Sequence, residues 1–135
     1  MDAAARVHRS AFDSALPTLR GLHTPEEDRW FFRERVFRNC DIWGAFRGEE
    51  MAGIIAFRND WIDQLYVLPE AQGQGFGTVL LEVAKGAFDR LQLWTFQRNI
   101  AARRFYEARG FALVRETDGS GNEEREPDAL YLWTR

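Results

Sequence analysis

A glycine-dense segment, residues 72–78, has the composition of a phosphate-binding turn. Its sequence is Gln-Gly-Gln-Gly-Phe-Gly-Thr, with glycine at every second position from 73 to 77. The preceding run, Trp61 to Leu68, is rich in β-branched and aromatic residues and predicts a strand that ends at Pro69. Helical spacing follows, with apolar residues at Phe76, Val79, Leu80, Val83, Ala84 and Ala87.

A strand, a glycine turn and a helix in this order direct unpaired backbone N–H groups, and the positive end of a helix dipole, towards an anion. Because glycine has no side chain, the backbone can approach a phosphate closely. We therefore expect the amides of residues 73–78 to bind a pyrophosphate, with Gln72 as a side-chain donor. A glycine turn without a ligand is the alternative.

Two familiar phosphate-binding motifs do not fit this segment. A P-loop requires a lysine directly after its last glycine, and no lysine occupies that position here. The dinucleotide fingerprint requires glycine where this chain has Thr78, and the next predicted strand, residues 91–96, ends in no acidic residue for a ribose. The ligand is therefore expected to be a different kind of diphosphate.

A second pattern follows, Asn99-x-x-Ala102-x-x-x-Tyr106-x-x-x-Gly110-Phe111. It predicts a helix of about two turns with its polar residues on one face, ended by a glycine in the left-handed conformation. Residues 101, 105 and 108 should then pack on the sheet from the other face. Taken alone, the tyrosine is equally well explained as an ordinary amphipathic residue.

Together, Gln72-x-x-Gly75-x-Gly77, preceded by Leu65-x-Val67-x-Pro69, and the later Asn99 pattern resemble the two signature motifs of the GNAT superfamily, the acetyl-CoA-dependent N-acetyltransferases. The resemblance covers residues 2–116. It implies that the acetyl group of acetyl-CoA passes directly to an amine in a ternary complex. The cofactor contacts that it implies come from Leu65, Tyr66, Val67, Gln72, Gly73, Gln74, Gly75, Phe76, Gly77, Thr78, Asn99, Ala102 and Tyr106.

Two titratable side chains are candidates for the proton transfers that such a reaction needs. Tyr106 is the candidate acid for the leaving thiolate, because a phenol with a pKa of about 10 stays protonated at neutral pH. Asn99 is expected to position the CoA arm. Asp63 is the candidate proton relay, since strand alternation should place it on one face with Leu65 and Val67. A solvated or structurally paired carboxylate is the alternative for Asp63.

The acceptor side is described less sharply by the sequence. In this family the first two helices border the acceptor, so Trp30 or Phe31 could line its pocket, and core packing is the alternative for both. Four acids in residues 118–128 could attract a cationic acceptor or simply form a solvated surface: Glu123, Glu124, Glu126 and Asp128. We expect a small-molecule amine as the acceptor. A non-catalytic acyl-CoA-binding sensor is the alternative function.

Length and composition restrict the class of protein. Residues 1–135 are expected to form a single domain with one core. The formal net charge is -3 and no basic run is present, so nucleic acid is not an expected partner. One cysteine and two histidines leave no metal-ligand cluster to draw. No export signal or membrane span is apparent, and a cytoplasmic location is expected.

The predicted element order is helix-helix-β-β-β-α-β-α-β-β. This order predicts an α/β (α+β) domain with a mixed, mostly antiparallel sheet flanked by helices. The resemblance implies a strand before the first helix, whereas this sequence starts at that helix. The strand at residues 41–47 should then be an exposed sheet edge, covered in a homodimer or by the chain's own termini, unless the sequence as given simply begins late.

Overall fold

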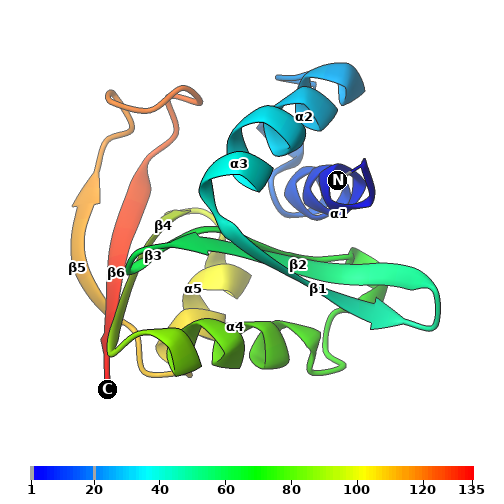
Figure 1. The fold of residues 1–135 in the computed structure, drawn as a ribbon. Coiled ribbons are helices and arrows are strands. Elements are labelled where there is room, and N and C mark those ends of the chain that lie inside the picture. Colours follow the sequence, from blue (N-terminus) through cyan, green and yellow to red (C-terminus); the bar gives the residue numbers. More distant parts are fainter. Residues whose placement is uncertain (1, 20) are drawn as a thin grey trace.

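The computed structural model describes residues 2–19 and 21–135, which form a six-stranded sheet. Helices lie on both faces of this sheet (Figure 1). The strand order is β1-β2-β3-β4-β6-β5, and only the β3–β4 pair is parallel in the described chain. The predicted element order and the mostly antiparallel sheet are confirmed. The strands are β1 (Asp41–Arg47), β2 (Glu50–Arg58), β3 (Trp61–Val67), β4 (Arg90–Phe96), β5 (Ala112–Thr117) and β6 (Asp128–Thr134).

One face of the sheet is covered by the N-terminal helices. Helix α1 (Asp2–Ala15) packs over β2 and β3, followed by the short helix η1 (Pro17–Leu19). The predicted second helix begins at Thr24, whose side chain forms the expected capping box with Glu27. It consists of α2 (Pro25–Phe31), a π-helical turn η2 (Phe32–Val36) and α3 (Phe37–Asn39). Phe32 and Val36 from this turn are buried against α1 and β2.

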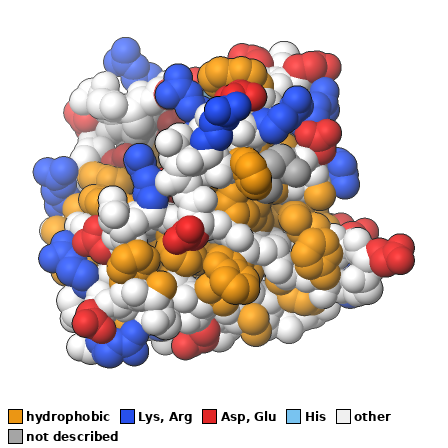
Figure 2. Space-filling view, viewed as in Figure 1, with side chains coloured by type: hydrophobic (Ala, Val, Ile, Leu, Met, Phe, Trp, Pro, Cys, Tyr) orange, Lys and Arg blue, Asp and Glu red, His pale blue; other side chains and the backbone are white. Residues whose placement is uncertain are grey.

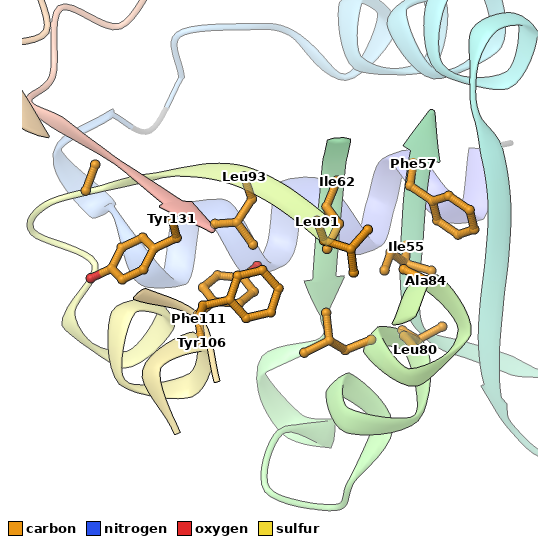
Figure 3. Close-up of a cluster of buried hydrophobic side chains, with 12 residues drawn as sticks. Ile55, Phe57, Ile62, Leu80, Ala84, Leu91, Leu93, Tyr106, Phe111 and Tyr131 are labelled. Carbon is orange, nitrogen blue, oxygen red and sulfur yellow. The ribbon is translucent and has the colours of Figure 1, made fainter. Parts of the chain in front are cut away.

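Helices α4 (Phe76–Ala87) and α5 (Ile100–Glu107) lie on the opposite face, where Figure 3 shows the larger core cluster. The short helix η3 (Pro69–Ala71) precedes the turn into α4. Tyr106 enters this core from α5, with Ala102 and Phe105 packed beside it. The prediction that Ala101 and Ala108 pack on the sheet is wrong, because both are exposed and neither belongs to this core cluster.

The end of α5 shows why its glycine is needed. Gly110 has φ +91°, the Phe111 N–H donates to the Tyr106 carbonyl at 3.1 Å, and the Gly110 N–H donates to the Glu107 carbonyl at 3.3 Å. These two bonds form a Schellman motif, which requires a left-handed residue after the helix. The predicted helix stop is confirmed, and it directs Phe111 into the core beside Tyr106.

Strand β1 is an edge strand, as predicted, and within the described residues it pairs only with β2. Trp43 and Phe46 on β1 are more than half exposed, and Figure 2 shows hydrophobic side chains gathered on this side of the molecule. The termini lie elsewhere, since α1 covers a sheet face and the Arg135 N–H donates to the Asp89 carbonyl. Cover of this edge by the chain's own termini is therefore wrong, whereas pairing in a homodimer stays a prediction.

In the described part of the chain, no helix combines the length and the apolar character that crossing a membrane requires.

Candidate active site

A large cavity opens where the two parallel strands separate. Trp61 of β3 lies opposite Gln92 of β4, and the Gln92 N–H donates to the Asp60 carbonyl at 2.7 Å. Beyond this point the strands diverge, and a cavity of about 1620 Å³ lies between them. Residues 62–67 of β3 and 93–96 of β4 line it, together with the glycine turn and one side of α5. We call this cavity the cleft.

Strand β3 turns an open backbone edge towards the cleft. The Leu68 N–H donates to the Ala52 carbonyl of β2 at 2.8 Å. Because N–H and C=O groups alternate in direction along a strand, Tyr66 points its backbone groups towards β2, and Leu65 and Val67 point theirs into the cleft. A ligand with amide groups can pair with such an edge as an additional strand. Of the three predicted residues here, Tyr66 has its backbone groups directed at β2, and the Val67 carbonyl accepts from Gln72 Nε2, which leaves the Leu65 backbone and the Val67 N–H open to the cleft.

The glycine turn has the conformation that a phosphate site needs. Gly73 and Gly75 have φ values of +80° and +90°, in the region that favours glycine. Gly75 is the N-cap of α4, and the Val79 N–H donates to the Gly75 carbonyl at 3.1 Å as the first helical bond. The amides of residues 76–78 precede that bond, so they belong to the helix N-terminus that faces anions.

Gly77 is required for a different reason. A Cβ atom at this position would lie 3.1 Å from the Phe105 ring, closer than nine in ten real Cβ contacts. Its glycine therefore lets α4 approach α5 at the edge of the cleft. Local conformation and close packing thus explain three alternating glycines in one turn.

The side chains around the turn differ from the prediction in detail. Gln72 donates from Nε2 to the Val67 carbonyl at 3.1 Å, so it braces the turn against β3. Gln74 donates to the Glu70 carbonyl at 3.3 Å and, unlike the other predicted cofactor residues, does not line the cleft. The prediction of Gln72 as a phosphate donor is therefore untested, while Gln74 has no side-chain role in the cleft.

Arg109 is a candidate residue that the sequence reasoning missed. Its Nε and Nη2 atoms donate to Thr78 Oγ1 at 3.0 and 2.9 Å, and its guanidinium lies 3.8 Å from the Phe105 ring centroid. This contact places a cation beside the N-terminus of α4, in the lining of the cleft. The only signal in the sequence is a basic residue directly before Gly110, and its proximity to Thr78 arises from the packing of α5 beside α4.

Tyr106 lies deep in the cleft and in the core at once. Its side chain is 8% exposed and packs edge-on against Phe105 and Phe111, with ring centroids 5.4 Å apart in both pairs. Burial, and next the nearby Tyr66 hydroxyl, raise the pKa of Tyr106 above the ordinary value of a phenol. The hydroxyl therefore stays protonated at neutral pH, as a proton donor must.

Asn99 and Ala102 line the cleft beside Tyr106. The Asn99 side chain also has a local task, because its Oδ1 accepts from the Ala102 N–H at 3.2 Å and caps α5. A change at Asn99 would therefore affect the start of α5 as well as any ligand contact.

Asp63 does not lie where strand alternation predicts. A β-bulge pairs Ala56 with Gln64 but Phe57 with Ile62, which leaves Asp63 as the extra residue. As a result Ile62 and Leu65 share one core cluster, so the predicted common face of Asp63, Leu65 and Val67 is wrong. The bulge shifts the alternation of side chains along β3. It arises from the pairing of β3 with β2, so the sequence of β3 alone does not predict it.

The Asp63 carboxylate is engaged within the protein. It accepts from Arg58 Nε at 2.8 Å and from Cys40 Sγ at 3.4 Å. Burial, and next the hydrogen bond to Asp63, raise the pKa of the Cys40 thiol to about 11. This geometry favours the paired carboxylate, and a role for Asp63 as a proton relay stays a prediction.

A second cavity of about 550 Å³ adjoins the cleft, and we call it the side cavity. Six residues line both, namely Phe12, Gln64, Tyr66, Trp94, Phe96 and Glu124. The remaining walls come from α1, from α2 and the segment before it, and from the loop after β5: His8, His23, Glu26, Glu27, Asp28, Trp30, Phe31 and Glu123. Trp30 and Phe31, which the sequence singled out, therefore border a cavity.

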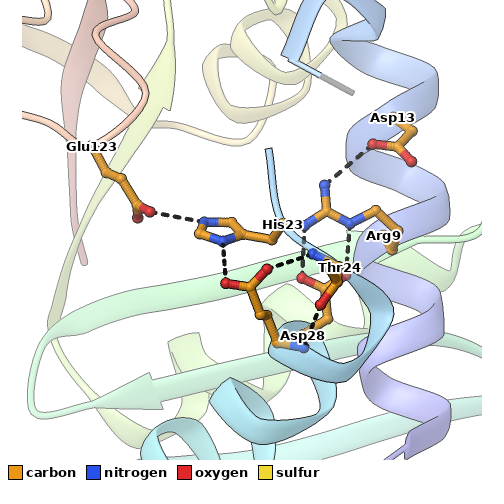
Figure 4. Close-up of polar contacts among 7 residues, drawn as sticks. Arg9, Asp13, His23, Thr24, Asp28 and Glu123 are labelled. Atoms are coloured by element: carbon orange, nitrogen blue, oxygen red, sulfur yellow. Dashed lines mark hydrogen bonds and ion pairs between the residues drawn. The ribbon is translucent and has the colours of Figure 1, made fainter. Parts of the chain in front are cut away.

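The wall formed by α1 and α2 is held by ion pairs (Figure 4). Arg9 donates to both oxygens of the buried Asp28 at 2.7 Å and to Asp13 at 3.2 Å. His23 contacts Glu123 at 2.9 Å and so joins the segment before α2 to the loop after β5. These contacts fix the outer boundary of the side cavity.

The four acids of the 118–128 loop have four different environments. Glu126 is buried and pairs with Arg98 at 2.9 Å, whereas Asp128 bonds to Thr117 and to Asn122. Glu123 contacts His23, and Glu124 lines both cavities. A solvated surface therefore does not describe this loop, and only its tertiary contacts separate the four carboxylates.

Within residues 2–19 and 21–135, no group of three or more His, Cys, Asp and Glu side chains is arranged to hold a metal ion.

The chain is similar in sequence to known proteins. The family model described as the acetyltransferase (GNAT) family matches residues 8–111. An uncharacterized N-acetyltransferase of Archaeoglobus fulgidus is 31% identical over 123 residues, covering 72% of this chain and 83% of the relative.

Solved structures share the fold. The apo form of YjaB from Escherichia coli matches with a TM-score of 0.78 and 18% identity, over 96% of this chain and 87% of that one. The PaiA N-acetyltransferase of Thermoplasma acidophilum, solved in complex with coenzyme A, matches with a TM-score of 0.69 and 19% identity, over 99% and 92%.

Proposed function

The chain belongs to the acetyltransferase (GNAT) family and is an acetyl-CoA-dependent N-acetyltransferase, and from that premise we propose that it acetylates the primary amine of a small molecule. The divergence of β3 and β4 after Trp61 is the observation that carries the proposal, because it opens a cleft with a free strand edge and a glycine turn. A bound acetyl-CoA supplies an activated acetyl thioester, and the residues of the chain must hold it and manage protons.

The residues present fit the chemistry of this cosubstrate. In the proposal, the amides of residues 76–78 and the Arg109 guanidinium bind the diphosphate at the N-terminus of α4. The pantetheine amides pair with the backbone of Leu65 and Val67. Asn99 and Ala102 border the arm near Tyr106. Each of these assignments uses a donor or acceptor that already faces the cleft.

Tyr106 is the proposed proton donor of the reaction. Transfer forms one C–N bond and breaks one C–S bond, and a proton must reach the departing sulfur as the amine loses one. A phenol whose pKa is raised by burial enters the reaction protonated, and its proton stabilises the charge that develops on the sulfur. Tyr106 is the tyrosine that lies in the cleft on α5, at the end of the predicted arm.

The size of the side cavity supports a small acceptor over a protein chain. Its volume of about 550 Å³ lies in the range of sites for small ligands. Helix α2 and the 118–128 loop, joined by the His23–Glu123 contact, border its outer side. A cytoplasmic location remains the expectation from the sequence.

Calorimetric titration with acetyl-CoA, followed by thiol release with a panel of small amines and peptides, tests the proposal. We expect saturable binding at one site per chain and release that depends on a small amine. Binding without release across the panel would instead favour the acyl-CoA sensor. Release with peptides alone would contradict the small-molecule acceptor.

A further inference from the structure

We propose that the side cavity selects singly charged primary amines with an aromatic or apolar body, and that Glu124 binds their ammonium group. The inference rests on the proposed function, because it assumes that the acceptor enters beside the cleft. It names a substrate class and a specificity residue that neither the family nor the fold specifies.

The position of Glu124 is the first support. It is one of the six residues that line both cavities, so its carboxylate lies at the junction through which an amine would reach the cleft. The Glu124 charge also acts on the neighbouring Tyr66: burial, and next the charge of Glu124, raise the Tyr66 pKa to about 12. Within residues 2–19 and 21–135, no hydrogen bond or ion pair engages the Glu124 carboxylate.

The other acids of the side cavity are occupied. Asp28 accepts from Arg9 at 2.7 Å, and Glu27 accepts from the Thr24 N–H at 2.8 Å as part of the capping box. Glu123 contacts His23 at 2.9 Å, and Glu26 lies 3.5 Å from Arg29. Among residues 2–19 and 21–135, a ligand therefore finds one carboxylate of this cavity without a partner, which suits one positive charge.

The shape of the junction explains the preference for an aromatic or apolar body. Besides Glu124, four aromatic residues line both cavities at the junction: Phe12, Tyr66, Trp94 and Phe96. Aromatic faces attract an ammonium group and bury the carbon skeleton that carries it. Trp30 and Phe31 extend the apolar wall outward along α2. The ring of Phe12 packs edge-on against Phe96 with centroids 6.1 Å apart, which holds α1 against β4 at this point.

Charge disfavours other amines in the same cavity. Its lining contains five carboxylates and, among the described residues, no lysine or arginine. An amino acid or another amine with a carboxylate would bring a negative charge beside them. A diamine would leave its second ammonium among apolar rings and occupied acids.

The test uses the full chain with 2-phenylethylamine, putrescine, glutamate and a short peptide as acceptors. We expect 2-phenylethylamine to have the highest kcat/KM. Glu124→Gln should raise its KM roughly 10-fold or more, because a partly buried charge pair is lost, and should leave the acetyl-CoA Kd unchanged. Glu124→Asp should recover much of the affinity. Glu49→Gln, in the exposed β1–β2 turn, is the matched charge control and should change nothing.

The outcomes separate the inference from the proposed function. If the wild-type chain does not bind acetyl-CoA, the proposed function itself is overturned. Acetyl-CoA binding with preferred acetylation of putrescine, glutamate or the peptide would overturn the inference alone. An unchanged KM in a folded Glu124→Gln chain would do the same. Calorimetry of 2-phenylethylamine with CoA-saturated protein gives a readout without turnover, and weaker binding by Glu124→Gln supports the assignment.

Discussion

The two cavities of the molecule are built in different ways. The cleft is formed mainly by backbone from one continuous stretch, β3 and the glycine turn, against the diverging strand β4. The side cavity collects side chains from α1, α2, β3, β4 and the loop after β5. Backbone recognition depends on conformation, so the constrained positions of the cleft are those with an unusual conformation, Gly73 and Gly75. Side-chain recognition can change by substitution while the fold persists, which is how one architecture can serve many acceptors.

The largest effect should come from Tyr106, the proposed proton donor in the cleft. Tyr106→Phe removes the proposed proton donor and keeps the ring that packs on Phe111, so kcat should fall roughly 100-fold or more. The acetyl-CoA Kd should change little. Steady-state kinetics and calorimetry measure the two values. Tyr131→Phe is the control, because its buried hydroxyl bonds to Arg103 and Glu107 outside the cleft. Equal kcat values for the two variants would contradict the assignment.

A change in the glycine turn should affect the cleft through its backbone. Valine at Gly75 is strained at φ +90° and adds a side chain where a phosphate would approach, so acetyl-CoA affinity should fall roughly 10- to 100-fold. Calorimetry measures the change.

Gly86→Ala, in the same helix, is the matched control for Gly75→Val. A Cβ atom at Gly86 meets nothing within 4 Å, and alanine should stabilise the helix by up to about 1 kcal/mol. Normal acetyl-CoA affinity in a folded Gly75→Val chain would show that the turn is not the phosphate site.

A substitution in the wall of the side cavity should change stability and acceptor KM without changing acetyl-CoA affinity. Asp28→Asn removes a buried carboxylate from Arg9 and should reduce the free energy of unfolding by about 2–3 kcal/mol. Acceptor KM should rise, whereas acetyl-CoA affinity should stay the same. Urea unfolding and steady-state kinetics measure these effects. Asp13→Asn, which removes the more exposed of the two Arg9 pairs, should lose less than 1 kcal/mol. A similar loss in both variants would contradict the special role of the buried pair.

The smallest expected effect is a pH dependence that arises in the side cavity. Burial, and next the charge of Arg9, lower the pKa of His8 to about 4, from 6.5 in an unfolded chain. The unfolded chain therefore binds a proton between pH 6.5 and 4 that the folded chain does not. Keeping His8 neutral therefore costs no stability above pH 6.5. The free energy of unfolding decreases as the pH falls from 6.5 towards 4.

His8→Phe should remove about 1–2 kcal/mol of the stability difference between pH 7 and pH 5. Urea unfolding of wild type and variant at both pH values measures this difference. An identical pH dependence in the two chains would mean that the pKa of His8 is the same in the folded and unfolded chains, which contradicts this account.

The same contrast explains what the sequence could and could not predict. The glycine turn, the capping box at Thr24 and the Gly110 stop are local signals, and all three have the expected conformations. The face of Asp63 was mispredicted because a bulge depends on the register with β2. The Arg109 contact with Thr78 joins two helices that are distant in sequence.

The limit of prediction from sequence is clearest in the loop of residues 118–128. Glu123, Glu124 and Glu126 are equivalent by type and spacing, and the sequence gives no reason to separate them. Their roles differ because His23 and Arg98 come from distant segments and engage only two of the three. Side-chain recognition of this kind depends on tertiary contacts, whereas the backbone of the cleft follows from local sequence.

Amide hydrogen exchange by NMR, with and without acetyl-CoA, tests most directly whether the open edge of β3 receives the cosubstrate. The account predicts slower exchange on binding at Leu65, Val67 and residues 76–78. Tyr66 is an internal control, since its N–H already points to β2 and its protection should not change. Protection confined to α2 and the loop after β5, with no change at Leu65 and Val67, would contradict the central claim.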